Sequence, residues 1–192
     1  MSEEKTVARL GLPWSVGIVV GLSLIPGMLF GKFNFTLWVC FIAWAEYFVF
    51  GAAPKAFKIL IPCWLYGTLM AAFWMAMTVF VANYTTLFWA AFTTNFIALP
   101  LLMWGCKFHN FGEGSLAVFG GFTCFLALYF TGVFPKQLGL DATVNPYLII
   151  LITIIWDLLM GYVGHFFGWL TIVLTFPHKV PAASTVASSV QG

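Results

Sequence analysis

The sequence predicts an all-α fold: a polytopic integral membrane protein with six transmembrane helices. Of its 192 residues, 62% are hydrophobic and only 7% are charged. The apolar residues gather in long runs, and a helix of about 20 apolar residues crosses a hydrocarbon core of about 30 Å. A soluble domain of this size could not bury so much apolar surface. We therefore expect one transmembrane domain over residues 1–180, followed by a disordered, uncharged tail over residues 181–192.

Six apolar runs define the predicted helices, and short polar or turn-forming segments separate them. The first run holds Gly17 and Gly21 at the G-x-x-x-G spacing that lets two membrane helices pack closely. The connections are too short for an extramembrane domain, and the one at Asn83 is a tight turn. The predicted helices cover residues 12–31, 35–53, 57–82, 84–105, 115–134 and 146–175.

The last run is longer than the membrane core is thick. An unbroken helix from Pro146 to Phe176 would be about 46 Å long at about 1.5 Å per residue. The excess length predicts one of three things: a strong tilt, an end that runs along the interface, or a break within residues 161–168.

The distribution of lysine and arginine predicts the orientation. Six spans place six of these eight residues on one side and two on the other. Because basic residues are retained on the cytoplasmic side, both termini are predicted to be cytoplasmic. The larger group comprises Lys5, Arg9, Lys55, Lys58, Lys107 and Lys179, and the smaller group comprises Lys32 and Lys136.

An acid and a histidine share one face of the last predicted helix. Asp157 and His165 lie eight residues apart, and Gly161, Gly164 and Gly168 fall on or beside the same face. One interpretation is a hydrated path for a solute or a proton, because histidine titrates near neutral pH and the glycines leave room for water. The other is a close-packed helix interface in which neighbouring helices satisfy both polar side chains.

A second acid, Glu46, lies within the second apolar run. A charge inside a membrane helix is costly, and it persists mainly where it faces protein or water. Glu46 either pairs with Lys55 or Lys58 at the cytoplasmic rim or lines a cytoplasmic vestibule. Asn95 adds an uncharged polar side chain in the fourth run, where such groups either hold helices together or contact a solute.

No pattern in the sequence indicates catalysis, a metal or a cofactor. The four cysteines are isolated, without the paired spacing of metal ligands, and the histidines form no close pair. The net charge of +2 comes without a dense basic run, so nucleic acid is not an expected partner. We expect no enzyme activity.

The second apolar run carries a resemblance to a known family. The pattern Trp38-x-x-Phe41-x-x-Trp44-Ala45-x-Tyr47-Phe48-x-x-Gly51, followed by Gly67 and Trp74, resembles the small membrane proteins grouped as domain of unknown function 1097. The similarity extends over roughly residues 15 to 135. It implies a multi-span protein of the bacterial inner membrane, and it carries over no catalytic residues.

These features together predict a small channel or secondary transporter for an unidentified small solute. The path residues would be Asp157, His165, Glu46 and Asn95. The exposed small-residue faces predict a homo-oligomer in the lipid bilayer. The alternative is a non-catalytic accessory subunit packed against a larger bacterial membrane complex.

Overall fold

The described part of the computed structural model contains six α-helices, one at each predicted apolar run. The structure describes residues 4–7, 10–29, 31–108, 111–140, 145–175 and 178–181. The all-α prediction is confirmed, with one addition: two four-residue strands, β1 (Glu4–Val7) and β2 (His178–Pro181), which pair antiparallel. The helices are α1 (Leu12–Leu29), α2 (Leu37–Val49), α3 (Phe57–Ala82), α4 (Leu87–Gly105), α5 (Ser115–Thr131) and α6 (Pro146–Thr175).

Four of these helices, α1, α3, α4 and α6, are long and apolar enough to cross a membrane. The protein is therefore a multi-pass membrane protein. The other two helices, α2 and α5, are also apolar but have only 13 and 17 residues. Left-handed backbone ends both of them early: Gly51 and Ala52 follow α2, and Gly132 caps α5. Because the backbone turns away at these residues, the two helices end before the predicted runs 35–53 and 115–134 do.

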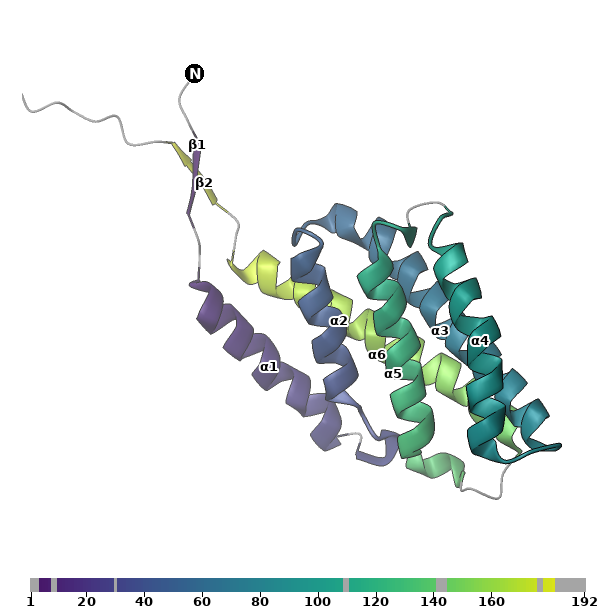
Figure 1. The fold of residues 1–192 in the computed structure, drawn as a ribbon. Helices are drawn as coiled ribbons and strands as arrows, with labels where there is room; N and C mark the ends of the chain where they lie inside the picture. The colour runs from purple at the N-terminus through teal and green to yellow at the C-terminus, as the bar shows by residue number, and fades with distance from the viewer. Residues whose placement is uncertain are drawn as a thin grey trace, which may run out of the picture.

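Helix α6 is continuous over 30 residues, so of the three alternatives for its excess length the break within residues 161–168 is wrong. Figure 1 shows α6 running obliquely behind α2 and α5. α2 lies along α6, while α3 packs against α5 on one side and α4 on the other. The core therefore lies where α2, α3, α5 and α6 meet.

The strand pair β1–β2 brings together the segment that precedes α1 and the segment that follows α6. β1 precedes α1 and β2 follows α6, so the start of α1 and the end of α6 lie at the same end of the molecule (Figure 1). Pro181, the first residue of the predicted tail, pairs with Glu4 in this sheet. Residues 182–192 of that tail lie outside the described residues.

Glycines let α3 and α5 approach until their backbones touch. A Cβ atom on Gly67 of α3 would overlap the main chain of Val118, and one on Gly121 of α5 would overlap the carbonyl group of Trp64. Gly17 and Gly21 of α1 differ, because a Cβ on either would meet no atom within 4 Å. Their predicted close packing is therefore not used within this chain.

We predict that Gly67→Ala lowers the stability of the bundle, whereas Gly17→Ala does not. Forcing a methyl group into the α3–α5 contact should cost about 1–3 kcal/mol, because backbone atoms cannot move aside as a side chain can. Alanine at position 17 enters open space and is the better helix former. Unfolding by sodium dodecyl sulfate in mixed micelles measures both free energies. Equal stability of the two variants would contradict the packing of α3 on α5.

Candidate functional site

Three of the predicted polar residues meet inside the bundle. Glu46 comes from α2, and Asp157 and His165 come from α6. All three are buried, Asp157 and His165 completely. Glu46 lies on the face of α2 that turns towards α6, and its Oε2 atom is 3.6 Å from Nε2 of His165. Glu46 also interacts electrostatically with Asp157. We call these three residues, together with Thr68 and Trp64 of α3, the buried cluster.

Asp157 is held by α3. The Oγ1 atom of Thr68 is 2.5 Å from Oδ2 of Asp157, and the same Oγ1 atom is 3.0 Å from the carbonyl oxygen of Trp64, one turn earlier in α3. The contact with Asp157 joins α3 to α6, and the apolar composition of α3 did not reveal it. Thr68 is fully buried, so no bulk solvent reaches the contact.

Trp64 fills the space between the polar side chains. Its ring meets the His165 ring edge-on, with the centroids 5.3 Å apart. Gly161 of α6 lies against the same indole, and Gly120 of α5 lies against the indole and the Glu46 carboxyl group. A Cβ atom at either glycine would overlap these side chains. The room that the sequence suggests for water beside Gly161 is therefore taken by Trp64.

The other two glycines of the α6 face contact α2. Gly164 lies against the backbone of Cys40 and against Ala43, and Gly168 lies against the ring of Tyr47. Close packing by these glycines draws α2 onto α6 and brings Glu46 within reach of His165.

Several polar atoms of this cluster make no hydrogen bond with any residue that the structure describes. Buried polar groups are nearly always paired, and an unpaired one costs about 1–3 kcal/mol. A concentration of such atoms at one place is typical of a functional site rather than of a core selected only for stability. The atoms are Oε2 of Glu46, Oδ1 of Asp157, both ring nitrogens of His165 and Nε1 of Trp64.

The structure corrects both interpretations of Glu46. Its side chain turns into the bundle, and its closest charged or titratable contact among the described residues is the imidazole of His165, not Lys55 or Lys58. It is 4% exposed, so it lines no open vestibule. Spacing along α2 could not reveal this, because the partner lies more than a hundred residues away.

Asn95 lies apart from the cluster, half-buried on α4. The neighbouring Thr94 makes the contacts that hold α4: its hydroxyl oxygen accepts a hydrogen bond from Nε1 of Trp74 at 3.0 Å and lies 2.8 Å from the Thr78 hydroxyl. Nothing among the described contacts connects Asn95 with Asp157 or His165.

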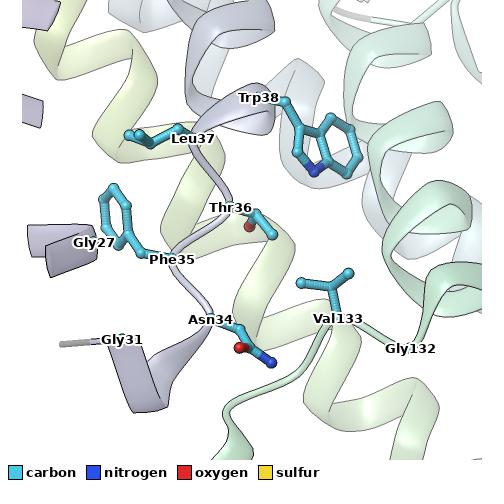
Figure 2. Close-up of a pocket in the computed structure, with 9 residues that line it drawn as sticks. All are labelled: Gly27, Gly31, Asn34, Phe35, Thr36, Leu37, Trp38, Gly132 and Val133. Carbon is cyan, nitrogen blue, oxygen red and sulfur yellow. The ribbon is translucent and has the colours of Figure 1, made fainter. Parts of the chain in front are cut away.

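A separate pocket of about 510 Å³ opens at the end of the bundle opposite to the strands. It is lined by the turn that leads into α2 and by the residues that follow α5 (Figure 2). The Asn34 side chain donates a hydrogen bond to the carbonyl group of Phe134 and so ties these two segments together. No member of the buried cluster lines this pocket, so it is not an open route to Asp157.

No group of three potential metal ligands lies together in the part of the chain that the structure describes. The four cysteines, Cys40, Cys63, Cys106 and Cys124, are buried, and no disulfide joins any of them. His109 lies outside the described residues.

Two residues of the cluster, Thr68 and Trp64, were not selected from the sequence. The only local signal was a hydroxyl residue one turn after a tryptophan in an apolar run. Threonine is common in membrane helices, where its hydroxyl usually bonds to its own backbone, so this signal is not specific.

We predict an energetic coupling between Glu46 and His165. In a double-mutant cycle with Glu46→Gln and His165→Gln, an interacting buried pair should show a coupling of about 0.5–3 kcal/mol. Unfolding in mixed micelles measures it. The matched control is the cycle of Glu46→Gln with Thr171→Val, a buried residue of α6 that bonds to its own helix. Strict additivity in both cycles would show that the 3.6 Å approach of the pair has no energetic consequence.

A comparison with known proteins identifies the family of the chain. No curated protein and no solved structure matches the chain. One family model, described as a protein of unknown function (DUF1097), matches residues 14–169, which include all members of the buried cluster. The match extends beyond the expected residues 15–135 and covers most of the chain. The chain therefore belongs to the DUF1097 family.

Proposed function

We propose that this membrane protein moves a small solute across the bilayer, with Glu46, Asp157 and His165 as the polar centre of the pathway. The observation that carries the proposal is the buried cluster itself. Two acids and a histidine are drawn together from α2 and α6, and several of their polar atoms make no hydrogen bond with the described residues. Ionisable residues inside membrane helices are costly and typically mark ion or proton pathways.

The closed form of the cluster favours a secondary transporter over an open channel. Asp157 and His165 have no exposed surface, and Trp64 packs between the polar groups. A permanently open pore would need a wetted surface at these residues. Passage through this site would instead require helices to move and expose the cluster to each side in turn, as in alternating access.

We further propose that all six helices cross the inner membrane of a bacterium, with both termini in the cytoplasm. The pairing of β1 with β2 supports an even number of crossings. The lysine and arginine bias supports the orientation. The short helices α2 and α5 would span a locally thinned bilayer or be extended by their flanking turns.

Labelling with a membrane-impermeant maleimide tests this topology. We expect Asn83→Cys, in the exposed turn between α3 and α4, to react in intact cells. Glu113→Cys, exposed before α5, should react only after permeabilisation. The four native cysteines are buried and should give little background. Labelling of both positions from the same side would overturn the crossing by α4 and with it the six-span topology.

A homo-oligomer is part of the proposal. Gly17 and Gly21 meet nothing in their own chain, so the close-approach surface of α1 is free for a neighbouring helix. We propose no enzymatic role.

One observation favours an accessory subunit as the second candidate. The outer face of α4 carries a continuous series of exposed aromatic rings, each packed on the next: Phe88, Trp89, Phe92 and Phe96. Aromatic side chains are enriched at protein interfaces, so this face could contact a larger membrane complex.

The decisive measurement is solute flux into liposomes. We expect Asp157→Asn to reduce flux at least tenfold or to abolish its pH dependence, because the amide keeps the shape of the carboxyl group and loses its titration. The wild type and the variant would be compared across small neutral solutes, weak acids and ammonium. The matched control is Glu113→Gln, an exposed acid outside the helices.

Two results would count against transport. Wild-type flux equal to that of protein-free liposomes for every solute would favour the accessory subunit. An Asp157→Asn protein with normal flux and altered thermal stability would assign Asp157 a purely structural role.

A further inference from the structure

We propose that Asp157 is a proton-binding site and that Thr68 is the positioning residue that orients the bound proton. The inference rests on the proposed function and deepens it by naming the proton as the species that couples to the cluster. It concerns the contact between α3 and α6, not the Glu46–His165 pair.

The Thr68 hydroxyl group has two hydrogen-bond contacts but only one hydrogen to donate. Its Oγ1 atom lies 2.5 Å from Oδ2 of Asp157 and 3.0 Å from the carbonyl oxygen of Trp64. A hydroxyl group has one hydrogen to donate and can accept through its oxygen. The Trp64 carbonyl can only accept. Both contacts are full hydrogen bonds at once only if Asp157 is a carboxylic acid that donates to Thr68.

The surroundings of Asp157 disfavour a charged carboxylate. Its side chain is fully buried, its polar neighbours on α3 are the Thr68 hydroxyl and the Trp64 indole, and no basic side chain forms an ion pair with it among the described residues. A carboxylate without a cation in such a place would be neutralised rather than left charged. The titratable groups that interact electrostatically with Asp157 bring no positive charge, because they are Glu46 of α2, Cys124 of α5 and Tyr162 of α6. His165, on α6 itself, is directed towards Glu46.

Asp157 would alternate between a protonated and an ionised state, each with its own hydrogen bond to Thr68. On protonation, a proton from water forms an O–H bond at Oδ2 of Asp157, which then donates to Thr68 while Thr68 donates to the Trp64 carbonyl. On release, that proton returns to water, and the Thr68 hydroxyl turns to donate to the carboxylate. The rotation of one hydroxyl group thus gives Asp157 a hydrogen bond in both states. Release requires water to reach Asp157, so it accompanies opening of the cluster.

Infrared spectroscopy on the full chain in lipid nanodiscs tests the proton directly. The carboxylic acid C=O band is absent from a carboxylate. The chain has only two aspartates, Asp141 and Asp157, so labelling aspartate with ¹³C at the carboxyl carbon shifts only their bands. We expect a labelled acid band at pH 7 that persists in Asp141→Asn and disappears in Asp157→Asn. A labelled wild type that shows only carboxylate at pH 7 would overturn the inference.

The role of Thr68 has its own variants. Thr68→Val removes the hydroxyl at nearly constant volume and should shift the frequency of the labelled acid band, whereas Thr68→Ser should leave it near the wild-type frequency. The matched control is Thr78→Val, which removes another buried hydroxyl of α3 that contacts α4 rather than Asp157. If Thr68→Val does not fold, Thr68→Ala removes the same hydroxyl with less bulk. An unchanged band in the folded variant would exclude Thr68 as the positioning residue.

This experiment separates the inference from the transport proposal. An acid band at Asp157 without measurable flux for any solute would leave the proton site standing and remove transport. Measurable flux together with an ionised Asp157 at pH 7 would leave the transport proposal standing and remove the proton site.

Discussion

The fold depends on how closely α3 can approach its neighbours. Gly67 and Gly121 bring α3 and α5 to backbone contact, and Gly120 and Gly161 make room for the indole of Trp64. Without this approach Thr68 could not reach Asp157 across the α3–α6 interface. In lipid, where the hydrophobic effect does not favour one helix neighbour over another, tight packing and interhelical hydrogen bonds supply the specificity. The glycines therefore determine both the architecture and the geometry of the polar cluster.

This packing also explains how charge-bearing residues remain inside the bundle. Glu46 reaches α6 because Gly164 and Gly168 let α2 lie directly on that helix. The cluster is then enclosed by tryptophan rather than by water, which makes any ionised form expensive and any proton exchange dependent on helix movement. α4, held to α3 through Thr94, Trp74 and Thr78, contributes no member to the cluster.

Much of the fold could be predicted from run lengths alone, because each helix in lipid must satisfy its own backbone and therefore forms a continuous apolar segment. The prediction was less accurate where the chain turns, since the left-handed residues at Ala52 and Gly132 end helices inside apolar stretches. Helical spacing correctly placed Asp157 and His165 on one buried face. It could not show that Glu46 faces His165 or that Thr68 faces Asp157, because both pairings depend on how distant helices cross. Residues 182–192 remain a sequence-based prediction.

The buried threonines of α6 can be compared with Asp157 and His165 on the same helix, because the two groups of polar side chains are satisfied differently. Thr153, Thr171 and Thr175 each donate to a carbonyl group one turn earlier in α6, so each is satisfied within its own helix. Polar residues that serve only to stabilise a membrane bundle can be accommodated in this way at little cost. Asp157 and His165, on the same buried face of α6, have no such local solution and retain unpaired atoms. The buried acid and histidine of α6 thus differ from its threonines in depending on other helices for their polar contacts, and this difference supports the proposed role of Asp157 and His165 in the exchange of protons or solutes.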